Sequence, residues 1–177
     1  MEIRACTDDD LDVLRSRWVT AGDVHEAHHA RQSEGRATYL VAWRDDEPLG
    51  SGMVQWAGCV GLSARSAFPD AVEINHLQVR AQFRGHGLGQ LLIETAEALA
   101  AQRGRNQIAV GVSEGNRDAE RLYVRLGYRP TGVFDVSEYD WADDDGVVHH
   151  EVEHDEILVK ETHRSPDLGG RASLLAL

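Results

Sequence analysis

The chain has 177 residues, of which 42% are hydrophobic and 27% charged, as expected for one globular domain. No apolar run approaches the roughly 18 residues of a membrane span, and the acidic N-terminus lacks the apolar core of a secretion signal, so we expect a cytoplasmic protein. The net charge of −12 disfavours nucleic-acid binding and favours a cationic partner. Cys6 and Cys59 have no metal-ligand or redox spacing and suit buried, reduced positions.

The first half of the chain predicts strands and helices in a simple order. Thr7 can cap a helix, and the three aspartates after it lie where a helix dipole favours carboxylates. Leu11, Leu14 and Trp18 follow at helical spacing. The predicted elements are a strand over 2–6, a helix over 8–19, a weaker helix over 24–32, and a hairpin of strands over 38–43 and 49–56.

The second half predicts an alternation of strands and helices that ends in a hairpin. The elements are a loop over 58–70, a strand over 72–79, a helix over 88–102, a strand over 107–112, a helix over 116–126, and strands over 128–136 and 147–160 around a turn at 143–146. The strand–helix–strand crossover makes its two strands parallel, so we expect a mixed α/β sheet. Residues 1–162 are expected to form the domain and 163–177 a flexible tail.

A strand followed by a glycine-rich turn and a helix is the most informative pattern. The turn is Arg84-Gly-His-Gly-Leu-Gly89. Glycines at a helix N-terminus let backbone N–H groups converge on an anion. A dinucleotide fingerprint would need a third glycine where this chain has Gln90, and the Gly-Lys-Ser/Thr of a Walker A loop is absent. The alternative is a turn used only for chain reversal.

Three motifs in this order resemble the GNAT superfamily of N-acetyltransferases. They are the strand Glu73-Ile-Asn-His-Leu-Gln-Val79, the loop Arg84-x-x-Gly87-x-Gly89, and Asn116 followed by Ala119, Leu122-Tyr123 and Gly127-Tyr128. The resemblance covers roughly residues 38–132. It implies a single-domain, centrally splayed mixed sheet flanked by helices, with acetyl-CoA as cosubstrate and no metal.

The resemblance also implies a set of cofactor-binding residues. Backbone groups of the strand would meet the acyl carbonyl and the pantetheine arm, with the Leu77 N–H polarising the thioester, and the loop would bind the pyrophosphate. The side chains of Leu77 and Val79 are expected in the core. The full set is Leu77, Gln78, Val79, Arg84, Gly85, His86, Gly87, Leu88, Gly89, Gln90 and Asn116.

Two further residues have both a functional and a structural interpretation. Tyr123 lies about two helical turns after Asn116, and the resemblance implies that it protonates the leaving thiolate; the alternative is an aromatic packing residue. Asn116 can contact coenzyme A, cap its helix, or do both.

The general base has three interpretations that the sequence leaves open. Similar histone-acetylating proteins carry a catalytic glutamate at the position of Glu73. Strand alternation puts Glu73 and Leu77 on one face and His76 on the other, and four residues span about 13 Å, so Glu73 would act through water. A bulge would change the register and could turn His76 inward. Glu73, His76 or neither is the base.

The remaining histidines and acidic residues are more typical of side chains without a catalytic or metal-binding role. The runs His25-x-x-His28-His29 and His149-His150 with His154 lack a completed four-ligand set, so we expect solvated or acceptor-facing side chains. The acidic residues of the last hairpin could attract an amine but are more typical of a solvated turn. These residues are Asp135, Glu138, Asp140 and Asp143–Asp145.

The sequence therefore predicts an enzyme that transfers acetyl directly from acetyl-CoA to a primary amine. The amine belongs to a small molecule or a peptide, and its identity cannot be read because the loops that select it lie outside the motifs. Homodimers are common among similar proteins. The alternative is a non-catalytic acyl-CoA-binding sensor or scaffold with the same fold, which the presence of Glu73 and Tyr123 disfavours.

Overall fold

The computed structural model of the chain describes residues 1–20, 23–142 and 148–162. The strands are β1 (Glu2–Ala5), β2 (Ala37–Arg44), β3 (Glu47–Gln55), β4 (Val72–Val79), β5 (Gln107–Ser113), β6 (Arg129–Ala142) and β7 (Val148–Glu161). The helices are α1 (Asp8–Arg17), α2 (Val24–Ser33), α3 (Leu62–Ala67), α4 (Leu88–Gln102) and α5 (Arg117–Arg125), with a short 3-10 turn, η1 (Ala81–Phe83). Within these ranges no helix is long and apolar enough to cross a membrane.

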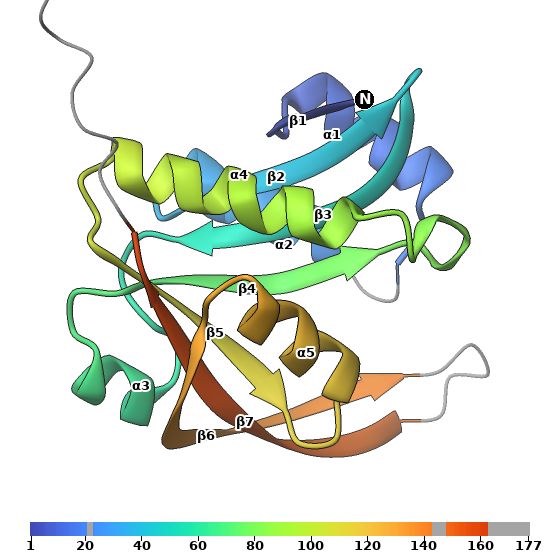
Figure 1. Ribbon diagram of the computed structural model, residues 1–177. Helices are drawn as coiled ribbons and strands as arrows, with labels where there is room; N and C mark the ends of the chain where they lie inside the picture. Colours follow the sequence, from blue (N-terminus) through green and yellow to red (C-terminus); the bar gives the residue numbers. More distant parts are fainter. Residues whose placement is uncertain (21–22, 143–147, 163–177) are drawn as a thin grey trace, which may run out of the picture.

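The strands form one sheet that splits at its centre. Their order is β1-β2-β3-β4-β5-β7-β6, and the only parallel neighbours among the described strands are β4 and β5. Those two strands pair only over Val72–Ile74 and Ile108–Val110, and beyond this point they diverge (Figure 1). The expected mixed α/β sheet with a central splay is therefore confirmed.

Helices cover both faces of the sheet. Leu88, Leu92 and Ile93 of α4 pack with the inward-facing residues of β2–β5 in the main core, which α5 extends with Tyr123. On the opposite face, Tyr39 of β2 lies in a second cluster with residues of the α1 segment, and α2 also contacts β2. The two faces of the sheet thus carry separate hydrophobic clusters.

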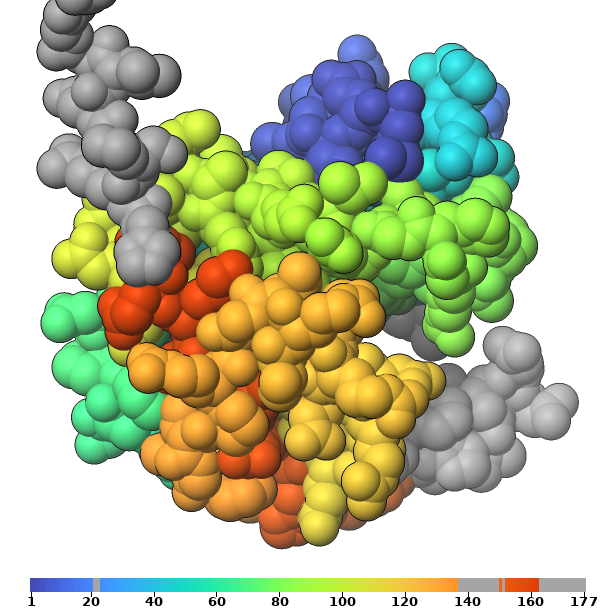
Figure 2. Space-filling model, viewed as in Figure 1, coloured from blue at the N-terminus to red at the C-terminus, as the bar shows by residue number. Residues whose placement is uncertain are grey.

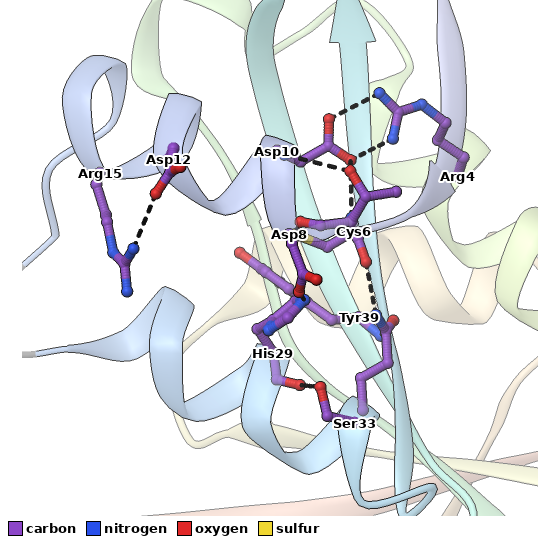
Figure 3. Close-up of polar contacts among 11 residues, drawn as sticks. Arg4, Cys6, Asp8, Asp10, Asp12, Arg15, His29, Ser33 and Tyr39 are labelled. Atoms are coloured by element: carbon purple, nitrogen blue, oxygen red, sulfur yellow. Dashed lines mark hydrogen bonds and ion pairs between the residues drawn. The ribbon is translucent and has the colours of Figure 1, made fainter.

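Polar contacts fix α1 and α2 to the start of the sheet (Figure 3). The predicted cap is present, because the Thr7 hydroxyl accepts from the Asp10 N–H and the Asp10 carboxylate accepts from the Thr7 N–H at 2.8 Å. Asp10 also pairs with Arg4 of β1. In α2, His29 Nε2 lies 3.2 Å from an Asp8 carboxylate oxygen. The two helices are therefore held together as one layer.

A bulge in β4 corrects the predicted alternation. Ser51 of β3 pairs with Gln78 and Met53 with Asn75, so Gly52 alone stands opposite two residues, His76 and Leu77. His76 has a left-handed φ of 50°. The extra residue turns Leu77 to the α4 face with Ile74, whereas Glu73 faces the other side. The prediction that Glu73 and Leu77 share a face is wrong.

Most predicted elements are confirmed, and the strand over 72–79 and the helix over 88–102 have the predicted bounds. The expected loop over 58–70 contains α3, which was missed because this six-residue helix has no apolar periodicity. Its first N–H groups are instead satisfied by Asp135, a residue distant in sequence. The turn at 143–146 and the tail at 163–177 lie outside the described residues, so the extent of the domain stays a prediction.

Candidate active site

The second half of β4 lies at the open split of the sheet. Leu77, Gln78 and Val79 follow the last residue of β4 that pairs with β5. The bulge also leaves Leu77 without a partner in register on β3. The Val79 carbonyl accepts a hydrogen bond from Arg84 Nε at 2.9 Å. The backbone of His76 and Leu77, without a register partner on either side, is therefore the part of β4 most open to a polar group entering the split.

The glycine-rich loop has the geometry of an anion site. Gly85 and Gly87 both have a φ of 79°, which glycine adopts without strain, and Gly87 is the N-cap of α4. A Cβ built on either glycine meets no atom within 4 Å, and both residues are exposed. The first N–H groups of a 15-residue helix thus face open space, at the positive end of the helix dipole.

The side chains around this loop shape it. His86 Nδ1 lies 2.8 Å from the Arg84 carbonyl oxygen and braces the turn. Gln90 donates to Glu94 at 2.8 Å along α4, and Leu88 is buried in the main core. Gly89 lies against Leu122 of α5. In Figure 2 the surface is hollowed between this loop and α5, which is the side on which the split opens.

Glu73 is a buried carboxylate at the closed end of the split. It is 7% exposed, and its only described hydrogen bond comes from the Val60 N–H at 2.8 Å. Burial raises the pKa of this carboxyl, the Val60 N–H opposes that effect, and the charges of Asp135 and Asp155 add to it. Glu73 is thus a better proton acceptor than a solvated glutamate.

The two acidic neighbours of Glu73 come from the last two strands. Asp135 pairs in register with Asp155. Asp135 accepts from the N–H groups of Ser63 and Ala64, and these bonds outweigh burial and hold the pKa of the Asp135 carboxyl below its ordinary value. A solvated turn was expected for the acidic residues of the last hairpin, with an acidic mouth as the alternative, and Asp135 instead caps α3. The side chains of the predicted acidic residues 138, 140 and 143–145 lie outside the described ones.

Tyr123 lies on the opposite face from Glu73. It is 4% exposed in the main core, and its ring meets Tyr128 edge-on with centroids 5.3 Å apart. Burial raises the pKa of its phenol above the ordinary value. Asn116 caps α5 by accepting from the Ala119 N–H at 3.2 Å, so its structural role is confirmed. Glu73 and Tyr123 are thus buried on opposite faces of the sheet.

His76, the alternative base, is exposed at the bulge. Its ring centroid lies 4.5 Å from that of His28 on α2. Desolvation of the ring and the charge of Arg31 lower the pKa of His76, so the imidazole is neutral near pH 7. The bulge considered in the alternative is present, but it leaves His76 exposed with its ring against His28 rather than turned inward. Glu73, His76 or neither is still the base.

The histidines were expected to be solvated or acceptor-facing, and the solvated interpretation is wrong for His25 and His28. His25 is 2% exposed, with its ring nitrogens 2.6 Å from the Tyr39 hydroxyl and 2.8 Å from the Trp18 carbonyl oxygen. His28 is 3% exposed. The sequence gives little sign that His25 and His28 are buried, because the side chains that cover them come from other elements. Among the described residues, no group of His, Cys, Asp or Glu could hold a metal ion.

The cysteines have the predicted character. Cys6 and Cys59 are both buried and free, and burial raises the pKa of each thiol to about 12. A thiol with so high a pKa is a poor nucleophile at neutral pH. Neither lies in the β4–loop–α4 region, which agrees with transfer that does not pass through a cysteine.

Comparisons with known proteins agree with this geometry. The model of the Acetyltransferase (GNAT) family matches residues 4–128. A Bacillus subtilis protein described as a ribosomal protein bS18-alanine N-acetyltransferase is 27% identical over 64 residues, which is 36% of this chain and 42% of that protein. A Methanocaldococcus jannaschii N-acetyltransferase is 36% identical over 64 residues, 28% of its length. The matches span less than half of these curated relatives.

Solved structures share the fold over nearly the whole chain. The ribosomal-protein-alanine N-acetyltransferase of Brucella melitensis superposes with a TM-score of 0.64 at 19% identity, covering 91% of this chain and 99% of that one. An aminoglycoside 6′-N-acetyltransferase complexed with coenzyme A has a TM-score of 0.60 at 20% identity, covering 94% and 100%. At such identities the likeness concerns the fold.

Proposed function

The chain belongs to the GNAT family of acetyltransferases, and on that premise we propose that it transfers an acetyl group from acetyl-CoA to a primary amine. The observation that carries the proposal is the open loop at the start of α4 beside the split of β4 and β5. The exposed N–H groups of the loop can bind an anionic pyrophosphate, and the backbone N–H of Leu77 can donate to a thioester carbonyl. Acetyl-CoA supplies the activated acetyl group.

We assign the proton transfers to two buried groups on opposite faces of the sheet. Glu73, whose pKa is raised by burial, accepts the proton of the attacking amine through a water, with His76 as the alternative acceptor. Tyr123 gives a proton to the thiolate that leaves. The Leu77 N–H stabilises the oxygen on which negative charge develops. The acetyl group moves directly to the amine, because no reactive thiol lies nearby.

The names of related proteins suggest the range of acceptors. One relative is described as acting on a ribosomal protein alanine and one structural neighbour on an aminoglycoside, so an amine of a protein or of a small molecule is the starting expectation. The two half-buried carboxylates near Glu73, Asp135 and Asp155, favour an approaching cationic amine.

The test is the release of free thiol from acetyl-CoA in the presence of an amine panel, with product mass as confirmation. Activity is expected with at least one amine and should exceed the rate without acceptor by at least about tenfold. A Glu73→Gln, Tyr123→Phe double variant provides the matched control for the same panel. A protein that binds CoA but acetylates no amine in a broad panel would contradict the proposal and favour a binding module.

A further inference from the structure

A cluster of basic side chains lies under α2, next to the bulge of β4. It consists of His28, Arg31 and His76. The His28 and His76 rings are in contact, with centroids 4.5 Å apart. His28 and Arg31 are three residues apart on α2 and therefore share a face of the helix. In a chain of net charge −12, the grouping of these three side chains on one face of the sheet needs a reason.

His28 is the first sign that this cluster lacks a partner. It is 3% exposed, and neither ring nitrogen has a hydrogen-bond partner among the described residues. A neutral imidazole always carries one N–H donor, and leaving a buried donor unpaired costs about 1–3 kcal/mol. The rings of Tyr39 and of the exposed His76 pack against His28, so an anion that shifts the His76 ring would give His28 the acceptor that it lacks.

Arg31 is the second, independent sign. Its side chain is half-buried, and no carboxylate of the described residues pairs with it. Other arginines of the same layer do have such partners: Arg4 pairs with Asp10 and Arg15 with Glu26. The positive charge of Arg31 lowers the pKa of both His28 and His76, so it lies close to two rings that are neutral near pH 7 and do not balance its charge. A half-buried guanidinium without a counter-ion favours a carboxylate, which it binds in a bidentate manner.

The neighbouring part of the same face has the opposite polarity. Asn75 pairs with Met53, which pairs with Tyr39 of β2, so all three side chains face the α2 layer. The Asn75 Oδ1 atom is buried without a donor. Two residues earlier in β4, Glu73 adds a carboxylate to that face. Oxygen acceptors therefore lie next to the basic cluster, on the side from which an amine can approach Leu77.

We propose that the acceptor is an α-amino acid, whose carboxylate binds to Arg31 and His76 and whose amine lies toward Asn75 and Glu73. The inference rests on the proposed function and specifies its acceptor. In an α-amino acid the amine and the carboxylate are bonded to one carbon, which matches a face on which the oxygen acceptor Asn75 directly precedes His76. An aminoglycoside or another polycation carries no anion for Arg31.

The experiment compares matched acceptors that differ only in the carboxylate. Each of the common amino acids is tested beside its amide and, where it exists, its decarboxylated amine, by thiol release and product mass. The acid of at least one set should have a kcat/KM at least about tenfold above its amide. Arg31→Gln should raise KM for the acid at least about tenfold with a smaller change in kcat, and Arg31→Lys should restore part of the loss.

Two controls separate this effect from a change in folding. Arg44→Gln removes another arginine, on the exposed end of β2, and should leave both acid and amide unchanged. The KM of Arg31→Gln for amides should also stay at the wild-type value. Urea unfolding of each variant checks that the fold is retained.

The outcomes distinguish this inference from the proposed function. If amides and decarboxylated amines are acetylated as well as the acids, or if Arg31→Gln leaves the KM of the acids unchanged, the inference is wrong while acetyl transfer stands. If no amine is acetylated, the proposed function fails, and the inference is then tested by whether the protein binds amino acids. Saturation-transfer NMR on the CoA-bound protein should then detect amino acids with the wild type and not with Arg31→Gln, and an equal signal would refute the anion site.

Discussion

Glu73 and Leu77, four residues apart on one strand, face opposite sides of the sheet because the bulge at His76 adds a residue between them. The side chain of Leu77 packs against the main core under α4, and its backbone lies beyond the last pair of β4 with β5, at the split. The carboxylate of Glu73 is instead buried beneath the Val60 segment, with a raised pKa.

The first prediction concerns this carboxylate. Glu73→Gln should retain affinity for acetyl-CoA and lose rate, by about 10²- to 10⁴-fold if Glu73 is the base. Because the base must be ionised, the wild-type rate should rise with pH through the raised pKa of Glu73, and the variant should lack that rise. Rate–pH profiles with a true acceptor check this. An unchanged profile in the variant would make His76 the next residue to replace.

The second prediction concerns the acid. Tyr123→Phe keeps the ring that packs on Tyr128, so it should bind acetyl-CoA normally and lower kcat by roughly 10- to 1000-fold. Tyr128→Phe is the matched control, because it removes a hydroxyl from the other ring of the same pair. Steady-state kinetics of both variants decide the matter. Equal activity of Tyr123→Phe and wild type would assign Tyr123 a packing role and leave solvent to protonate the thiolate.

The third prediction concerns the anion loop. Gly87→Val should abolish CoA binding, because the new side chain fills the open space before the N–H groups of α4. The change also strains a backbone with positive φ, at a cost of about 1–2 kcal/mol. Gly104→Val is the control, since Gly104 has a φ of 68°, open space around it and a place at the other end of α4.

Calorimetric titration with CoA measures the outcome. Both glycine variants should lose a similar amount of stability, and only Gly87→Val should lose binding. If the two variants bind CoA equally, the loop is a chain reversal and the cofactor site lies elsewhere.

The fourth prediction concerns His28 and the pH dependence of stability. Burial, and then repulsion of its protonated form by His76, Arg31 and His25, lower its pKa to about 3 in the folded protein. The unfolded chain has the ordinary value near 6.5, so below that pH the unfolded state binds a proton that the folded state does not. The stability attributable to this group is present above pH 6.5 and is lost as the pH falls toward 3.

His28→Phe should remove this dependence. Between about pH 6.5 and 4 the wild type should lose up to about 1.4 kcal/mol per pH unit relative to the variant. Urea unfolding at a series of pH values measures the difference. His25 and His76 also have lowered pKa values and remain in both proteins, so their effects cancel. A constant difference across this range would show that His28 is protonated in the folded state.

Local patterns were sufficient for the framework of this protein. The Thr7 cap, the apolar stripe of residues 88–102 and the glycines before it each act within a few residues of the chain, so their structure follows from nearby sequence. The order of elements then implied the parallel crossover of β4 and β5. For the same reason the cofactor loop and the family could be predicted before the fold was known.

The acceptor side of the site was decided by contacts between distant segments. The bulge arises where β4 meets Gly52 of β3, and it reversed the predicted face of Leu77. Glu73 owes its burial and its altered pKa to Val60 and to carboxylates of β6 and β7. His28 carries no signal of burial in a polar stretch of sequence, because the ring that covers it comes from β4. Register, desolvation and electrostatic coupling depend on which elements pack together, so these properties exist only in the tertiary structure.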